Sequence, residues 1–179
     1  RFLPLLTSLY LEGGDPMALP GAHVLRILSH ARERFPALER VACYATARAI
    51  NAKSVEELAR LASAGLRRVY VGLESGCDEI LTRIHKGSCR ADFLRAGHTL
   101  AQAGIENDVS IMLGIGGPEF SQQHADDTAS LLSELRPVCV RIRTFIPVGN
   151  SPMGQDYLAG RFTLMEPHDI LRELRLMVC

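Results

Sequence analysis

Short apolar segments rich in β-branched residues alternate with amphipathic stretches along the whole chain, and this alternation restricts the fold more than any other feature. Serial units of one strand and one helix build an α/β fold with a parallel sheet. Periodicity alone leaves a closed barrel and an open, doubly wound sheet as alternatives. In either one, right-handed crossovers bring the carboxyl ends of the strands to one edge, where ligands bind. The expected strands are 7–12, 39–45, 67–73, 107–114 and 138–145.

The segments between the strands carry helix signals. In 54–64, Ser54 and Glu57 have the spacing of a capping box, and Gly65 follows as a helix terminator. No linker rich in Pro, Gly or Ser divides the chain, so we expect one domain over residues 1–179. Further helices are expected at 77–85, 91–103, 121–135 (with Ser121 as its cap) and from about 167 onward.

Composition excludes several classes of protein. Hydrophobic residues make up 47%, charged residues 22%, and the net charge is zero, so nothing indicates binding to nucleic acid or to an anionic membrane. No apolar run reaches the roughly 18 residues of a membrane span, and no signal peptide opens the chain. The five cysteines show no disulfide pattern, so we expect a reducing, cytoplasmic setting.

The cysteines and histidines do not form a metal-binding pattern. The five cysteines are an odd number without a CxxC, which argues against a disulfide framework and against a metal site within this chain. At most two of them, Cys43 and Cys77, are expected near strand ends. The six histidines show no HxH or HxxxH spacing, and we expect them on the surface or on helix faces.

Glycines and polar residues gather directly after the strands. Taken singly, each such loop is ordinary turn chemistry, but all five together predict a ligand site at the carboxyl edge of the sheet. Glu74 is the most informative residue, because a carboxylate that follows an apolar strand is costly to bury without a partner. The loops are Gly13-Gly14-Asp15-Pro16, Thr46-Ala47-Arg48, Glu74-Ser75-Gly76, 114–119 and 147–152.

Four of these segments resemble, in order, motifs of the radical S-adenosylmethionine (SAM) enzymes. "YLEGGDP" resembles the GGE motif after the second barrel strand, with Asp15 in place of Glu. "VYVGLESGCDEILTRIHKG" resembles the fourth-strand segment of the subgroup with methylthiotransferases, coproporphyrinogen-dehydrogenase-like proteins and cobalamin-binding radical enzymes. "GIENDVSIMLGIGGPEFS" resembles the fifth-strand GxIxGxxE segment, and "FIPVGNSPM" the sixth-strand turn. The resemblance covers nearly the whole chain and implies a partial TIM-type (βα)6 barrel with parallel strands, units two to six, whose first unit is missing.

The resemblance also implies contacts with the methionine part of SAM. The loop of Gly13, Gly14 and Asp15 would hold the methionine ammonium, which relatives bind largely through backbone carbonyls. Lys86, a basic residue further along the fourth-strand segment, would meet the methionine carboxylate.

The nucleoside part would be bound by the next two loops. By resemblance, Glu74 with Ser75 nearby would contact the ribose. Ile115 and Gly116 would flank the adenine.

The implied activity needs more than this chain. The parent enzyme would reduce a [4Fe–4S] cluster with flavodoxin or ferredoxin, cleave SAM and use the 5′-deoxyadenosyl radical to abstract hydrogen from an unknown substrate. Thr46 and Arg48 lie where they could face adenosine or that substrate. The cluster-binding CxxxCxxC motif is absent. The chain starts at Arg1, where the second βα unit of the family begins, so we expect the cluster ligands outside this fragment. The subgroup includes cobalamin enzymes, but no residue here indicates cobalamin.

Two other functions remain open. The chain could be a non-radical βα-barrel enzyme that uses Glu74 or Asp15 as a general acid or base on a phosphorylated substrate. It could also be a nucleoside-binding module without a cluster. A CxxxCxxC motif upstream in the parent reading frame would favour the radical enzyme.

Overall fold

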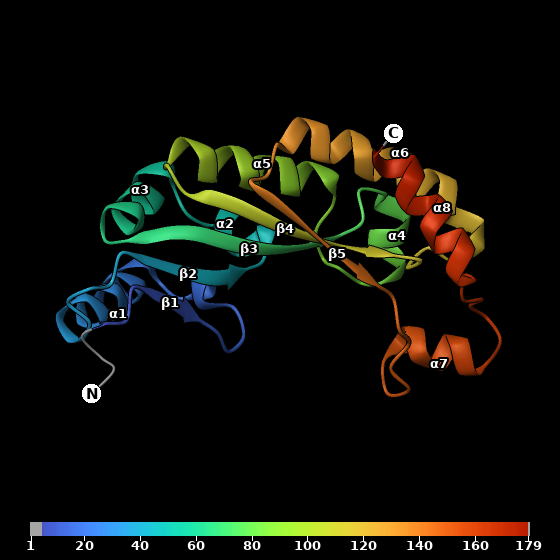
Figure 1. Ribbon diagram of the computed structural model, residues 1–179, viewed down its shortest axis with the longest axis horizontal. Coiled ribbons are helices and arrows are strands. Elements are labelled where there is room, and N and C mark those ends of the chain that lie inside the picture. Colours follow the sequence, from blue (N-terminus) through green and yellow to red (C-terminus); the bar gives the residue numbers. More distant parts are fainter. Residues whose placement is uncertain (1–4, 179) are drawn as a thin grey trace. The chain divides into compact units, whose positions relative to one another are not determined.

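The structure, a computed structural model, describes residues 5–178 and contains one five-stranded sheet (Figure 1). The strand order is β1-β2-β3-β4-β5, the same as the order along the chain, and the strands are parallel. All five predicted strands and the predicted α/β class are therefore confirmed. The strands are β1 (Ser8–Leu11), β2 (Arg40–Ala45), β3 (Leu66–Glu74), β4 (Glu106–Leu113) and β5 (Cys139–Thr144).

The predicted helices are present, and the one whose start differs clearly from the prediction is α6. In α3, the Ser54 hydroxyl accepts the Glu57 amide at 3.1 Å, and Gly65 takes a φ of 107° after the last turn, so Ser54 as the cap and Gly65 as the terminator are confirmed. The Glu57 carboxylate accepts a bond from Lys53 at 3.4 Å. The prediction that Ser121 caps its helix is wrong. The helix α6 begins at Gly117, because Pro118 suits the first turn of a helix, and Ser121 lies inside it.

Two short helices, α2 and α7, form in segments that the sequence indicates as loops. Both are begun by a hydroxyl cap, from Thr46 for α2 and from Ser151 for α7. The helices are α1 (Gly21–Arg34), α2 (Ala47–Asn51), α3 (Val55–Ser63), α4 (Asp78–Arg83), α5 (Arg90–Gln102), α6 (Gly117–Leu135), α7 (Pro152–Leu158) and α8 (Pro167–Val178), with a 3-10 helix η2 (Pro16–Ala18).

The chain divides into two compact units, and each has its own buried core. Unit 1 consists of residues 1–72, 92–109 and 137–139, and α1 packs against α3 in it. Unit 2 consists of residues 73–91, 110–136 and 140–179, and α6 packs against α8 in it. The prediction of a single domain stays a prediction. None of the helices within the described residues is long and apolar enough to cross a membrane.

Candidate functional site

In unit 1, the glycine loop after β1 presents its backbone to solvent. Gly13 and Gly14 have φ angles of 106° and 79°, which L-residues rarely adopt. Both residues are exposed, and a Cβ built on either one meets no atom within 4 Å. The glycines are thus required by the backbone conformation, and the space beside them is open to a ligand.

Asp15 closes this loop onto the end of β2. Its Oδ2 accepts the Thr46 amide at 3.0 Å and the Thr46 hydroxyl at 2.7 Å, while Oδ1 accepts the Met17 amide at 3.0 Å. Three of the roughly four acceptor positions of the carboxylate are therefore used inside the protein. Arg48, also from the predicted set, is exposed in α2.

The thiol of Cys43, in β2, is buried. Burial, and to a lesser degree the charge of Asp15, raises the pKa of Cys43 to about 12. Burial also raises the pKa of Cys77 in unit 2. Thiolates are the form that binds iron, so each of these thiols would first have to lose its proton to become a ligand. Among residues 5–178, no group of three His, Cys, Asp or Glu side chains could hold a metal ion.

In unit 2, Glu74 ends β3 in an unusual backbone conformation. Its φ is 67°, in the left-handed region that costs a non-glycine residue on the order of 1 kcal/mol. The carboxylate Oε1 lies 3.1 Å from Nζ of Lys86, and both side chains are largely but not fully buried, with 17% and 20% exposed. The structure thus brings together two of the predicted site residues, Glu74 and Lys86, as an ion pair.

The side chains of Ser75 and Ile115 lie in the core of unit 2. Ser75 is fully buried, and its hydroxyl contacts Nδ1 of His124 at 2.8 Å. Ile115 packs with Cys77 and Ile80 in an apolar cluster. A Cβ built on Gly116 would lie 2.8 Å from Cδ1 of Ile80. These contacts give Ser75, Ile115 and Gly116 an internal packing reason for their residue types.

A buried polar network surrounds these loops, and sequence reasoning missed it. It joins His124 of α6 and Glu173 of α8, both fully buried, to the segments after β3 and β4. Burial lowers the pKa of His124 to about 4, against the weaker opposing effect of its bond to the Met112 carbonyl. Burial likewise raises the pKa of Glu173. The only sequence signal was a glutamate on the apolar face of a helix.

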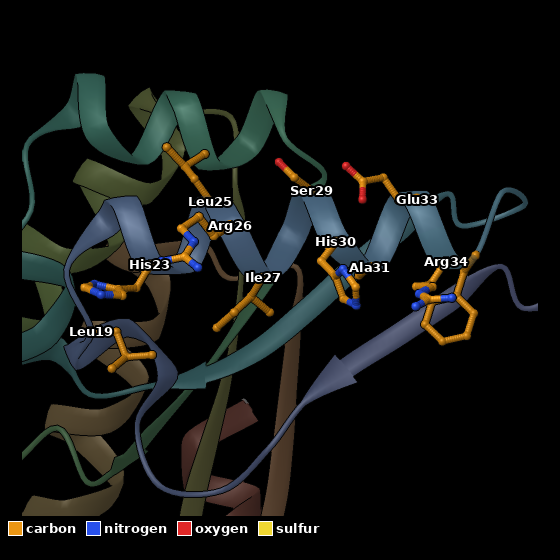
Figure 2. A pocket seen from close by; sticks show the side chains of 11 residues that line it. Leu19, His23, Leu25, Arg26, Ile27, Ser29, His30, Ala31, Glu33 and Arg34 are labelled. Atoms are coloured by element: carbon orange, nitrogen blue, oxygen red, sulfur yellow. The ribbon is translucent and has the colours of Figure 1, made fainter.

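A large hollow lies elsewhere, along α1 in unit 1. Figure 2 shows the side chains that line it, all from α1 and the residues just before and after it. Ile27, His30 and Arg34 lie together on this face, which carries no carboxylate–lysine pair and none of the strand-end loops. We therefore assign the candidate site to the strand-end loops and not to this hollow.

A model of the Radical SAM superfamily matches residues 3–132 of the chain. This segment includes the loops after β1, β2, β3 and β4. No sequence match to a curated protein accompanies it.

Several solved structures share the fold of this chain. The chain is similar to coproporphyrinogen III oxidase from Escherichia coli, described as a radical SAM enzyme, with 17% identity over 94% of this chain and 39% of that one (TM-score 0.74). It is similar to Elp3 from the archaeon Methanocaldococcus infernus, with 17% identity over 95% and 44% (TM-score 0.75). It also resembles the methyltransferase TsrM from Kitasatospora setae, solved with cobalamin and a [4Fe–4S] cluster, with 21% identity over 83% and 29% (TM-score 0.63). The chain spans less than half the length of these proteins.

Proposed function

Because the chain belongs to the radical SAM superfamily, we propose that it supplies the SAM-binding part of a radical SAM enzyme. Enzymes of this superfamily work with SAM and a [4Fe–4S] cluster. One observation carries the proposal for this chain: the Glu74 carboxylate, held in a strained backbone conformation at the end of β3 and paired with Lys86. Strain of this kind concentrates at functional sites, since folding alone would favour glycine at such a position.

The residues of unit 2 fit the nucleoside part of SAM. We assign Glu74 to the two ribose hydroxyls, because its carboxylate has acceptor positions left beside the bond to Lys86. Lys86 compensates the charge of Glu74 and fixes its orientation. Its assignment to the methionine carboxylate rests on the family resemblance. The backbone of the loop from Gly114 to Gly117 is assigned to the adenine, since the side chain of Ile115 is buried.

For unit 1, taken by itself, the assignment to the methionine part rests on the family resemblance. The exposed backbone of Gly13 and Gly14 is assigned to the ammonium group through its carbonyls, with no Cβ in the way. We assign Asp15 and Thr46 the task of holding this loop in place, since their side chains bond to each other.

When bound, SAM is the source of a 5′-deoxyadenosyl radical. The residues assigned here would bind SAM and orient it. Among the described residues, no group of three His, Cys, Asp or Glu side chains could hold the cluster, so we assign none of them to it. For the parent enzyme, we also propose a reductant such as flavodoxin or ferredoxin and a cytoplasmic setting. Its substrate is unknown.

The test is calorimetric titration of the chain with SAM and, separately, with adenosine. Glu74→Gln is expected to weaken the binding of both by about 1–3 kcal/mol, the range for hydrogen bonds to a charged group. The matched control is Glu79→Gln, the same change at an exposed position in α4. If Glu74→Gln binds SAM and adenosine with wild-type affinity, Glu74 has a structural role and does not contact the ribose. Absence of SAM binding by the wild-type chain would overturn the proposed function.

A further inference from the structure

Glu173 of α8 is a carboxylate in the core of unit 2, and its two oxygens both accept hydrogen bonds. It is fully buried. Oε1 accepts the amide of Gly114 at 2.7 Å, and Oε2 accepts the hydroxyl of Ser121 at 2.7 Å. A carboxylate in this position is costly, and an apolar side chain of the same size would pack without that cost. The reason for a glutamate therefore lies in the groups that it binds.

The more informative of its two partners is the Gly114 amide. Gly114 opens the glycine loop after β4 with a φ of 74°, and its carbonyl accepts the Gly117 amide at 3.1 Å to close a turn. Glu173 thus fixes the orientation of the peptide group at the start of the turn. The contact bridges 59 residues of sequence and comes from a helix beyond the segment matched by the superfamily model.

His124 of α6 holds the neighbouring loop in the same way. With its ring neutral, Nε2–H donates to the Met112 carbonyl at 3.2 Å, and Nδ1 accepts the hydroxyl of Ser75 at 2.8 Å. The Ser75 hydroxyl in turn accepts the Cys77 amide at 3.0 Å. Nε2 of His124 lies 3.8 Å from Oε1 of Glu173, so the two side chains are adjacent. The segment directly after Glu74 and the glycine loop are therefore fixed to one buried frame.

We propose that Glu173 is a positioning residue for SAM: it holds the backbone of the Gly114–Gly117 loop in the orientation that receives the adenine, with His124 aligning the segment after Glu74 beside it. This inference rests on the proposed function. It adds α8 to the binding machinery, as a helix that acts through the loop and does not touch the ligand.

The test compares two substitutions of similar size in the full chain. Glu173→Gln keeps an acceptor for the Gly114 amide, and its NH2 group can donate to Ser121, whose hydroxyl then turns to accept. Glu173→Leu removes both acceptors. The control is Met177→Ala, which removes a buried side chain from α8 at a distance of one helical turn along the sequence. Two quantities are measured: amide hydrogen exchange over residues 110–120, and the calorimetric affinity for SAM.

Glu173→Leu is expected to raise exchange at Gly114 about tenfold or more and to weaken SAM binding by a similar factor, since the Gly114 amide loses its buried acceptor. Glu173→Gln is expected to restore both to within about threefold of the wild type. Met177→Ala is expected to lower the melting temperature and leave both readouts unchanged. If Glu173→Leu does not fold, Glu173→Asp, with its carboxylate drawn back by one methylene, replaces it with the same expected direction.

The proposal is overturned if Glu173→Leu opens the loop yet binds SAM like the wild type, or if Met177→Ala weakens binding as much as Glu173→Leu. Failure of the proposed function gives a different result, because then the wild-type chain does not bind SAM at all. In that case the exchange data still decide whether Glu173 holds the loop: faster exchange confined to 110–120 supports it, and uniformly faster exchange overturns it.

Discussion

Gly116 is packed too closely by its own chain to carry a side chain. The family resemblance implies that Gly116 flanks the adenine. In the structure, a built Cβ lies 2.8 Å from Cδ1 of Ile80 and 2.9 Å from Cβ of Phe120, both tighter than ordinary contacts. The packing of unit 2 therefore favours glycine here, whether or not a cofactor also approaches the loop.

Gly116→Ala is accordingly expected to lower the free energy of unfolding by about 1–3 kcal/mol, the usual cost of overpacking. Urea denaturation measures it. Gly149→Ala is the matched control, because a Cβ there meets only Leu158 at 3.9 Å. If the two alanine variants are equally stable, Ile80 and Phe120 can move away from the added Cβ without a cost in stability.

At the scale of elements, Asp15 and Thr46 join two loops that follow different strands. Asp15 caps η2 through the Met17 amide, and the Thr46 hydroxyl caps α2 through the Ala49 amide at 3.2 Å. The bond between the two side chains therefore couples the starts of both helices across 31 residues of sequence.

A double-mutant cycle with Asp15→Asn and Thr46→Val is expected to give a coupling free energy of about 1 kcal/mol or more, as for other paired groups in contact. The exposed pair Asp169–Arg172 on α8 is the control, with an expected coupling below about 0.5 kcal/mol. If the effects of the two substitutions on the free energy of unfolding in urea are additive, the bond between Asp15 and Thr46 does not couple the two helix starts.

At the scale of the whole molecule, His124 makes stability depend on pH. Its pKa is about 4 when folded, because burial disfavours the charged ring, against about 6.5 when unfolded. The unfolded chain binds the proton more tightly, so this contribution is fully present above pH 6.5 and is lost as the pH falls toward 4. Between pH 7 and pH 5, the loss is about 2 kcal/mol.

His124→Gln removes this dependence, so its free energy of unfolding should fall about 2 kcal/mol less than that of the wild type over the same interval. Urea unfolding at pH 7 and pH 5 gives the comparison. His98→Gln, which removes an exposed histidine from α5, is the control. A wild-type pH dependence in His124→Gln would mean that His124 is not held neutral in the folded chain.

The sequence predicted the strands well because apolar runs between turn residues are a local signal. It did not predict α2 and α7, since helices this short depend on a cap and on tertiary packing more than on periodicity. It identified Gly13, Gly14 and Glu74 as unusual, because their residue types conflict with their local surroundings, but it did not predict that Glu74 pairs with Lys86. It could not show that Ser75 and Ile115 point into the core, because the direction of a side chain after a strand depends on the following turn. Glu173 escaped notice for a related reason: its partners lie far away in the sequence.

The division into two compact units has a consequence for how such a chain can be recombined. The backbone passes from one unit to the other five times, after Gly72, Ala91, Val109, Arg136 and Cys139, and three of these passages lie inside β3, β4 and β5. No single crossover between two related genes can therefore exchange one unit intact. A chimera joined at any of these points would combine hydrogen-bonded strands from two parents, and it would keep its sheet only where both parents share the same register.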